Sequence, residues 1–540
     1  MTDMIRQLLK NRAIPEDSWE AFLSPNYVAG THDPFLMKDM DKAVERILKA
    51  IENKENIVVY SDYDCDGIPG AVILHDFFKV INYDNFTVYI PDRHDEGYGL
   101  HRDAVESFIA QGTNLIITID LGITAIPEIA YAQESGVDVI VTDHHIPHET
   151  LPPAFAILNP KQPGCDYPFK ELCGSGVMFK LIQALMTKVS VPIGFDKWLL
   201  DMVGLATLSD MVPLVGENRV FAYYGMKVLP KTRRPGLRHL FKKTKLDVLH
   251  LTEDDLTFMI TPRINVASRL DSPMRAFSML STTDEVLGIQ EAEHLTKTND
   301  TRKTLVATIM KKVHTRMEEL SSSSIIIIGD PTWRPGVLGL VASKIVETYQ
   351  KPAFVWGGEG DSYKGSCRSD GSVHVVDLMT KVSHLFDVFG GHEFSGGFSL
   401  PKSSLLVFHD ELTSAYEKVK KEKELSSSYT IDAHLILTDI TPKFYNEIAQ
   451  LAPFGVGNPK PIFAFDNVRV MNIKHFGADG DHLEIMVSDG KVSKTAIAFF
   501  KKSSDYPKLE LGEMCTLVAT LEMSYFRGRP ELRMRIVDVK

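Results

Sequence analysis

Residues 139–145 have the sequence VIVTDHH, in which an apolar run and a threonine are followed by Asp143, His144 and His145. A short continuous run of β-branched residues is typical of a buried strand. A carboxylate and two imidazoles directly after such a strand are costly to bury unless they have partners. The stretch therefore predicts a strand of a buried sheet, with either a functional site or an ordinary solvated loop at its carboxyl end.

Predicted strands and helices alternate on both sides of this stretch. Because helices of about 10–15 residues between strands are typical of βαβ units, the pattern indicates an α/β fold with a parallel sheet. In such sheets, ligands bind at the carboxyl ends of the strands. The expected strands are residues 56–60, 86–90, 115–119, 139–142 and 156–158, and the expected helices are residues 41–53, 68–80, 102–110, 124–135, 176–189 and 196–208.

Acidic residues and histidines gather where these strands end. Three carboxylates follow the first strand, one follows the third, and the Asp-His-His segment follows the fourth. Since neighbouring strands lie about 4.8 Å apart, side chains at their carboxyl ends are expected to form one cluster. The cluster comprises Asp62, Asp64, Asp66, Asp120, Asp143, His144 and His145.

So many carboxylates cannot share a dry site without compensation, because like charges at close range repel strongly. Either their pKa values rise or cations neutralise them, and with two histidines present the simplest solution is a pair of divalent metal ions. Carboxylates with some imidazole suit Mn²⁺ or Mg²⁺ better than structural zinc. Two such ions activate a water and stabilise the oxygens of an in-line displacement, so phosphoester hydrolysis is the leading chemistry.

The acids at positions 62, 64 and 66 also resemble the start of a calcium-binding EF-hand loop. Gly67 occupies the position of the turn glycine in such a loop. The residue at the last ligand position, where the loop requires glutamate, is Ile73. A calcium-sensor function is therefore disfavoured.

Several short motifs of the chain resemble those of the DHH phosphoesterase superfamily. They are D-x-D-x-D-G at residues 62–67, D-x-G at 120–122, D-H-H at 143–145 and S-D at 209–210. Further segments resemble the RecJ branch, the single-strand-specific 5′→3′ DNA exonucleases. These are IPDR with EGYG within residues 90–99, RIN with SRL within 263–270, and GGH with GG within 390–397. The resemblance extends from about Pro34 to the C-terminus.

The resemblance implies roles for individual residues at the sheet edge. It makes Asp143 the carboxylate that orients His144, and His145 the group that contacts the scissile phosphate. The expected metal ligands are Asp62, Asp64, Asp66, Asp120, His144 and Asp210. The expected catalytic residues are Asp64, Asp66, Asp120, His144, His145 and Asp210.

The resemblance also implies that basic and small residues hold phosphates of a DNA strand. Glycines allow backbone amides to approach a phosphate closely. Ordinary ion pairs are the alternative for the arginines, and a tight turn is the alternative for the glycines. The expected phosphate-binding residues are Arg93, Arg269, Ser366, Arg368, Gly391 and His392.

The chain departs from the family pattern in two motifs. The middle residue of the second motif is Leu121, where the family usually has asparagine, and Ser395 and Gly396 stand where small alanines are usual. Neither change removes an expected metal ligand. The first is expected to alter hydrogen bonding around the metals.

The rest of the chain predicts a long helix, a second α/β unit and an all-β domain. Apolar residues at helical spacing extend over residues 284–320, and Ile325–Ile328 begins the second unit. Short strands with glycine turns after residue 429 are typical of an OB-like barrel. Such barrels stack bases on aromatic side chains, so the runs 499–502 and 525–529 are candidate DNA contacts, with core packing as the alternative.

These elements predict five segments. They are an N-terminal arm (1–40), a DHH catalytic domain (41–283), a connecting helix (284–320), a DHHA1-type substrate-binding domain (321–420) and an OB-like nucleic-acid-binding domain (428–540). The expected barrel strands are residues 430–437, 461–470, 482–487, 495–500, 514–521 and 532–537.

Composition and charge set limits on the function. The 540 residues are 44% hydrophobic and 24% charged, which is ordinary for a globular protein. We expect neither a secretory signal nor a membrane span, and the five cysteines include no C-x-x-C pair. The expectation is a cytoplasmic monomer without membrane contacts.

The net charge of −12 argues against a general nucleic-acid coat but not against a local basic groove. Residues 227–249 carry eight Lys or Arg residues against the single acid Asp247. This basic segment is either part of such a groove or an ordinary solvated face.

Together these features predict a metal-dependent exonuclease of single-stranded DNA. The resemblance implies 5′→3′ hydrolysis to 5′-mononucleotides with two Mn²⁺ or Mg²⁺ ions, in DNA repair, recombination or replication. A helicase and a single-strand-binding protein are the expected protein partners. A DHH phosphodiesterase for short oligonucleotides or cyclic dinucleotides is the alternative, and an inactive DNA-binding scaffold is a third possibility.

Overall fold

The computed structural model describes residues 1–320, 323–358, 360–420, 429–477, 480–525 and 530–540. Contacts divide the chain into two compact units. The first comprises Met1–Tyr89, Gly99–Thr261 and Ser427–Lys540, and the second comprises Ile90–Tyr98 and Pro262–Ser426. The expected boundaries at residues 321 and 428, and residues 526–529 of the second aromatic run, lie outside the described residues.

The first unit contains the predicted parallel sheet, so the α/β fold is confirmed. Its strands lie in the order β2-β1-β3-β4-β5, and every pairing is parallel. They are β1 (Ile57–Ser61), β2 (Phe86–Tyr89), β3 (Leu115–Ile119), β4 (Asp138–Thr142) and β5 (Ala156–Leu158). The chain places β2 on one side of β1 and then β3, β4 and β5 on the other side. The direction in which strands are added therefore reverses between β1 and β3, and sheets of this kind bind ligands at that point.

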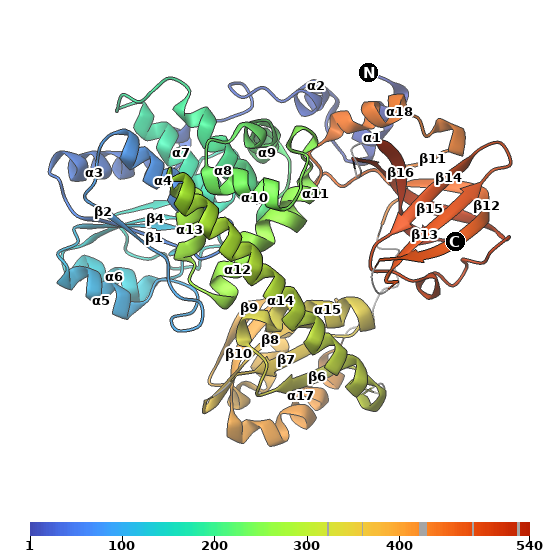
Figure 1. The fold of residues 1–540 in the computed structure, drawn as a ribbon. Helices are drawn as coiled ribbons and strands as arrows, with labels where there is room; N and C mark the ends of the chain where they lie inside the picture. Colours follow the sequence, from blue (N-terminus) through green and yellow to red (C-terminus); the bar gives the residue numbers. More distant parts are fainter. Residues whose placement is uncertain (321–322, 359, 421–428, 478–479, 526–529) are drawn as a thin grey trace. The chain divides into compact units, whose positions relative to one another are not determined.

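Helices cover both faces of this sheet (Figure 1). They are α5 (Arg102–Ala110) and α6 (Ile126–Glu134) on one face, and α3 (Met40–Glu52), α4 (Gly67–Val80) and α7 (Gly174–Met186) on the other. All five residues of β1 and all five of β3 are buried. A strand buried on both faces needs a continuous apolar run, which explains why the sequence shows no alternation there.

The end of the chain forms a five-stranded barrel, which confirms the OB-like domain. The strands are β12 (Phe463–Phe476), β13 (His482–Ser488), β14 (Ser493–Ala498), β15 (Met514–Ser524) and β16 (Glu531–Val539). Their order is β12-β13-β14-β16-β15, and an additional pairing of β12 with β15 closes the barrel. Closure removes the unpaired edges that an open sheet would expose.

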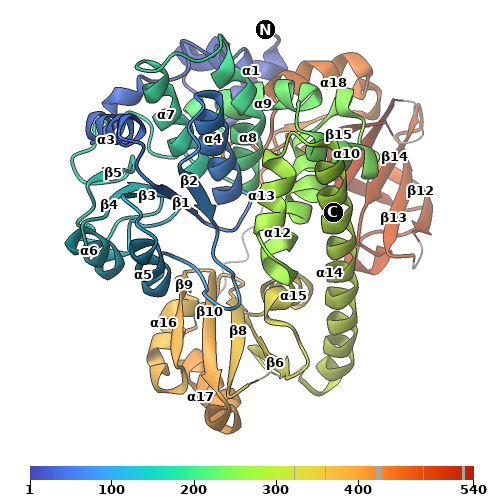
Figure 2. The same ribbon diagram turned by 60° about the vertical axis from the view of Figure 1, so that its left-hand side comes forward.

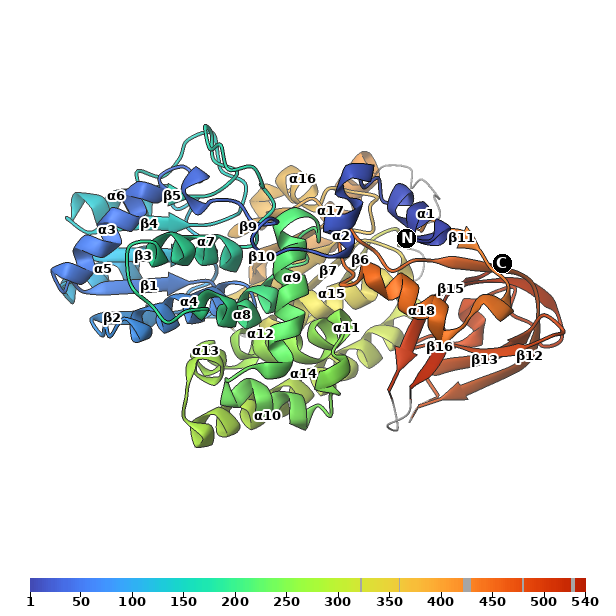
Figure 3. The same ribbon diagram turned by 90° about the horizontal axis from the view of Figure 1, so that it is seen from above.

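The expected strand at residues 430–437 is wrong over most of its length. Only β11 (Ala433–His434) pairs, and residues 437–439 form a 3₁₀ turn. Gln7 and Asn11 of helix α1 (Asp3–Asn11) donate side-chain hydrogen bonds to the carbonyl of Asp432, directly before β11. The N-terminal arm therefore covers this segment, and Figure 3 shows α1 beside β11.

The second unit contains a mixed sheet in the order β6-β7-β8-β10-β9, in which only β6 and β7 are parallel. Its strands are β6 (Ile326–Asp330), β7 (Ala353–Gly357), β8 (Ser362–Arg368), β9 (Val388–His392) and β10 (Ser395–Pro401). Alternate residues of the isoleucine run enter different cores. Ile326 and Ile328 pack with α14 (Glu285–Leu320) and α15 (Pro335–Tyr349), while Ile325 and Ile327 pack toward α16 (Val375–Lys381) and α17 (Leu405–Val419). Figure 2 shows these helices around the sheet.

The long connecting helix is confirmed as α14, which has 36 residues. Among the described helices, none is both long and apolar enough to cross a membrane. All five cysteines are buried and free.

Candidate active site

The structure gathers the predicted acids at the carboxyl ends of β1 and β3. Asp62 and Asp66 are 5% and 1% exposed, and Asp120 is 3% exposed. Asp120 follows β3 directly with φ +62°, a left-handed conformation that aspartate and asparagine tolerate better than most residues. Asp210 joins them from the C-terminal end of helix α8 (Phe195–Ser209).

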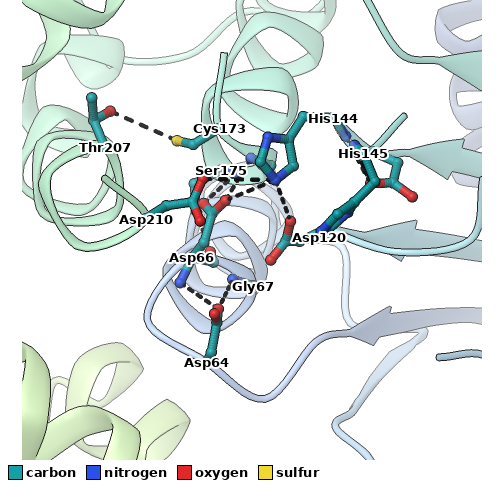
Figure 4. A network of polar contacts seen from close by, with 12 residues as sticks. Asp64, Asp66, Gly67, Asp120, His144, His145, Cys173, Ser175, Thr207 and Asp210 are labelled. Atoms are coloured by element: carbon teal, nitrogen blue, oxygen red, sulfur yellow. Dashed lines mark hydrogen bonds and ion pairs between the residues drawn. The ribbon is translucent and has the colours of Figure 1, made fainter. Parts of the chain in front are cut away.

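The imidazole of His144 lies at the centre of this group (Figure 4). Its Nε2 is 3.2 Å from Asp120 Oδ1, 3.7 Å from Asp210 Oδ2 and 3.8 Å from Asp66 Oδ2. His144 is 8% exposed. One buried nitrogen therefore faces three carboxylates from three different elements.

The first turn of α7 holds the carboxylate of Asp66. The backbone amide of Gly174 donates to Asp66 Oδ2 at 2.6 Å, and that of Ser175 donates to Oδ1 at 2.8 Å. A Cβ at position 174 would lie 2.5 Å from Asp120 Oδ1, so only glycine fits there. Neither residue is among the predicted site residues, although a Gly-Ser-Gly run before an apolar helix is a pattern that fits an anion-binding helix start.

The first turn of α4 holds the carboxylate of Asp64 in the same way. Asp64 Oδ1 accepts hydrogen bonds from the backbone amides of Asp66 at 2.7 Å and Gly67 at 3.1 Å. A Cβ at Gly67 would lie 2.5 Å from the carbonyl of Asp62. Both carboxylates are therefore positioned by backbone amides, and Oδ2 of Asp64 and the second lone pairs of the bonded oxygens are available to a cation.

Asp143 contacts a different histidine from the one predicted. Its Oδ1 lies 2.7 Å from Nδ1 of His145 and accepts the backbone amides of His144 and His145, while Oδ2 accepts the amide of Ile123. The expected orientation of the His144 ring by Asp143 is wrong. In an extended chain, the side chains of residues i and i+2 point to the same side. The side chain of Asp143 therefore contacts His145, and the ring of His144 points to the other side.

The charges of the site are strongly coupled. Burial, and then the neighbouring charges of Asp66 and Asp64, raise the pKa of Asp210 to about 9 and that of Asp120 well above its usual range. Burial would lower the pKa of His145, but the hydrogen bond and charge of Asp143 outweigh it and raise the pKa to about 9. At neutral pH the site therefore combines a cationic His145 with carboxylates that resist ionisation.

The donor set fits divalent metal ions. Three overlapping groups have ligand atoms within 4.8 Å of one another: Asp62 with Asp64 and Asp120, Asp66 with His144 and Asp210, and Asp120 with His144 and His145. Carboxylates with one or two imidazoles suit Mn²⁺ or Mg²⁺. Because Asp120 and His144 each occur in two groups, the arrangement fits two neighbouring ions.

All six residues predicted to bind phosphate lie in the second unit. Arg368 on β8 donates from Nη1 to Ser366 Oγ at 3.2 Å, and burial together with the charge of Arg93 lowers the pKa of Arg368. Arg269 donates to the carbonyl of Gly336 in the first turn of α15 at 3.5 Å. We call Arg93, Arg269, Ser366 and Arg368 the α15 arginine group.

Gly391 and His392 lie on β9, at the edge of the same sheet. Ser395 of β10 stands between His392 and Arg368 in the strand register, so His392 is two strands from the α15 arginine group. Gly391 has φ +143°, and a Cβ there would lie 2.3 Å from the carbonyl of Ser395. The hairpin packing of Gly391 therefore requires glycine, whatever it binds.

The basic segment at residues 227–249 is partly structural. Arg234 Nη2 lies 2.8 Å from Asp76 Oδ2, and its Nε lies 3.0 Å from Asp201 Oδ2. The guanidinium of Arg233 lies 3.9 Å from the ring centre of Trp198. Arg234 fits neither expected role, because its partners belong to the fold, whereas Arg233 is exposed, as expected of a solvated face.

The aromatic residues of the barrel differ in environment. Phe500 is 75% exposed, so it does not belong to the core. The guanidinium of Arg535 lies 4.0 Å from the ring centre of Phe499, and Tyr525 stacks on His250 at 3.8 Å. Phe500 is therefore the aromatic side chain of the first run that is available to a base.

Comparisons with known proteins agree with this architecture. Residues 56–207 match the N-terminal domain of the DHH family, residues 320–422 match the DHHA1 domain, and residues 431–538 match the RecJ OB domain. The chain is 32% identical over 542 residues to the single-stranded-DNA-specific exonuclease RecJ of Bacillus subtilis, covering 100% of this chain and 68% of that relative. It is 30% identical to the Escherichia coli RecJ exonuclease, covering 93% and 90% of the two chains.

A solved structure has the same fold. The crystal structure of RecJ in complex with Mn²⁺ from Thermus thermophilus matches with a TM-score of 0.84 and 25% identity, over 99% of this chain and 76% of that chain. The domain matches and the clustered acids define a DHH-type phosphoesterase. Within that class, the chain belongs to the RecJ family of single-stranded-DNA-specific exonucleases.

We predict that the metal-free chain loses stability as the pH rises. The unfolded Asp210 ionises near its ordinary pKa of 3.8, whereas the folded one ionises at about 9. Between these values the folded state binds the additional proton, so stability falls with rising pH. The thermal midpoint of the chain in EDTA should be lower at about pH 8 than at about pH 6, and Mn²⁺ should raise it most at the higher pH.

The Asp210→Asn variant is the matched control for this effect. It removes one of the groups that bind a proton in the folded state and should make the dependence of the midpoint on pH in EDTA shallower. An equal slope in the wild type and the variant would contradict the assignment.

Proposed function

We propose that this chain is a metal-dependent exonuclease that hydrolyses phosphodiester bonds of single-stranded DNA from the 5′ end and releases 5′-mononucleotides. The observation that carries the proposal is the group of carboxylates and imidazoles at the reversal point of the sheet, in a chain of the RecJ family. Its overlapping ligand groups suit the two-ion chemistry of phosphoryl displacement.

Two divalent ions, Mn²⁺ or Mg²⁺, are proposed as the cofactors. The residues that would hold them are Asp62, Asp64, Asp66, Asp120, His144 and Asp210. When bound, the ions supply activation of a water and stabilisation of the charge that develops on phosphate oxygens. The T. thermophilus relative was solved with Mn²⁺, which supports this choice.

The protein's own residues keep the site in place. Backbone amides of α7 and α4 fix Asp66 and Asp64, so these carboxylates do not need to reorganise when a cation or substrate arrives. His145 is held by Asp143, is cationic near neutral pH and is 37% exposed in its side chain. It would donate a hydrogen bond to an oxygen of the scissile phosphate.

The α15 arginine group would bind the terminal 5′ phosphate or the phosphates next to it. Its arginines repel one another, since the charge of Arg93 disfavours the charged form of Arg368. A phosphate relieves that repulsion and accepts charge-assisted hydrogen bonds. Recognition of a strand end by such contacts is what an exonuclease requires, and Gly391 and His392 would extend this surface.

The alternative functions have less support. A phosphodiesterase for dinucleotides has no need of a barrel for a long strand, whereas this chain has a closed barrel that matches the RecJ OB domain. An inactive scaffold has no need of converging carboxylates, whose repulsion is costly to maintain.

Single-stranded DNA is the proposed substrate, supplied by a helicase and a single-strand-binding protein. The chain is proposed to act as a monomer in the cytoplasm, in DNA repair, recombination or replication.

The decisive assay follows mononucleotide release from single-stranded DNA in Mn²⁺. We expect release from single strands but not from duplex, and we expect streptavidin on a 5′-biotin, but not on a 3′-biotin, to stop it. Asp120→Asn keeps a residue that tolerates the positive φ and should lower the rate at least about 100-fold, because loss even of a group that merely supports a metal ligand costs 10–100-fold.

The outcomes of this assay are distinct. Cleavage restricted to a dinucleotide would favour the alternative phosphodiesterase. DNA binding without any cleavage would favour the scaffold, and full activity of Asp120→Asn would contradict the site assignment.

Arg368→Gln is expected to lower kcat/KM for 5′-phosphorylated strands by about 10- to 100-fold, because it removes charged hydrogen bonds to phosphate. The loss should be smaller for strands with a 5′ hydroxyl, if the group binds the terminal phosphate. Steady-state rates on the two strands give the comparison, and Lys344→Gln, an exposed cation on α15, is the control. Equal losses on both strands would contradict binding of the terminal phosphate at this group.

A further inference from the structure

A second basic group lies on two helices of the second unit, apart from the α15 arginine group. Helix α12 (Thr261–Leu270) contributes Arg263, and α14 contributes Asn299, Arg302 and Lys303. We call these four residues the α12–α14 cluster. None of them belongs to the motifs that account for metal binding, and the proposed catalytic cycle uses none of them.

The helix geometry brings the side chains of the cluster together. Asn299, Arg302 and Lys303 are at positions i, i+3 and i+4 and so share one face of α14. Helical side chains lean toward the N-terminus, so Arg302 and Lys303 extend over the turn that carries Asn299. Burial, and then the charge of Arg263, lower the pKa of Arg302 and of Lys303, so Arg263 lies within electrostatic range of both side chains.

The cluster contains a buried amide that has no hydrogen-bond partner in the described part of the chain. Asn299 is 0% exposed, yet neither Oδ1 nor Nδ2 has a hydrogen-bond partner among the described residues. Nε of Arg302 is also buried, and it has no hydrogen-bond partner among the described residues. Such groups cost about 1–3 kcal/mol each and are rare in folded proteins. They indicate a ligand that completes their hydrogen bonds.

The charge of the cluster indicates an anion. The side chains of Arg263, Arg302 and Lys303 are cationic, and Arg263 is only 6% exposed. The nearby acid Asp300 is 64% exposed in its side chain and lies 4.0 Å from Lys303 Nζ, so solvent weakens its compensation. The cluster extends from the buried Arg263 to the exposed Lys303, which gives an anion access from the surface.

We propose that the α12–α14 cluster binds an internucleotide phosphate of the DNA strand. This inference rests on the proposed function and adds a second phosphate site to it. Guanidinium and amide N–H groups donate to phosphate oxygens, and such contacts fix the register of a strand without reading its sequence. Arg263 and Arg269 are six residues apart on α12, about 9 Å along its axis, so one rigid helix sets the spacing of the two phosphate sites.

The test measures binding without cleavage. The full chain is titrated in EDTA with a labelled single strand of about 20 nucleotides, at several salt concentrations. Arg302→Gln should weaken binding about tenfold and make the slope of log K against log salt shallower by about 0.7, the value for one phosphate contact on a single strand. Asn299→Leu should weaken binding while its thermal midpoint stays equal or rises, because it removes an unsatisfied amide.

Lys297→Gln is the matched control. Lys297 is exposed and lies two residues from Asn299, on the opposite face of α14. Its removal should change the affinity and the salt slope much less. If Arg302→Gln has the affinity and slope of Lys297→Gln, the phosphate site is contradicted. If Asn299→Leu lowers the thermal midpoint and leaves binding unchanged, the amide has only a structural role.

The failure of this inference is distinguishable from the failure of the proposed function. Binding in EDTA does not depend on catalysis, and cleavage by the wild type in Mn²⁺ is measured separately. If the wild type cleaves DNA and the variants bind DNA as tightly as Lys297→Gln does, only the phosphate site is contradicted. If the wild type does not cleave DNA but the variants bind DNA more weakly than the wild type does, only the nuclease activity is contradicted.

Discussion

Mutual repulsion between carboxylates at the carboxyl ends of β1 and β3 is the constraint on which the first unit depends. The buried parallel sheet and the reversal of its strand order bring Asp66 and Asp120 together beside His144. The fold offsets part of the repulsion with backbone amides at the starts of α4 and α7, and the remainder appears as the raised pKa of Asp120 and Asp210. A divalent cation removes that remainder, which links metal binding to stability.

In the second unit, positive charges and not negative ones are held close together. The α15 arginine group and the α12–α14 cluster hold cations near one another, and Asn299 is buried without satisfied hydrogen bonds among the described residues. Both units therefore contain unfavourable arrangements at the places where a ligand of opposite charge would bind. Local violations of this kind are expected at functional sites, where the rest of the fold compensates for them.

Local sequence patterns predicted the elements that build the site, because apolar runs and chain order are enough to place acids at the ends of β1, β3 and β4. They did not predict contacts between distant segments. Gly174 meets Asp120 and Asp66 through tertiary packing, and the N-terminal arm packs on a barrel more than 400 residues away. The strand predicted at 430–437 is mostly not formed, because β-propensity alone does not supply a neighbouring strand to pair with. The prediction that Asp143 orients His144 was wrong because it ignored which side of the extended chain each histidine side chain faces.

The most direct test of the central claim is calorimetric titration of the metal-free chain with Mn²⁺ in buffers of different ionisation enthalpy at neutral pH. Carboxylates that resist ionisation must release protons when a cation binds. We expect two bound ions per chain and a net release of protons, which is smaller in Asp210→Asn. Binding of fewer than two ions, or a heat that does not depend on the buffer, would contradict the central claim.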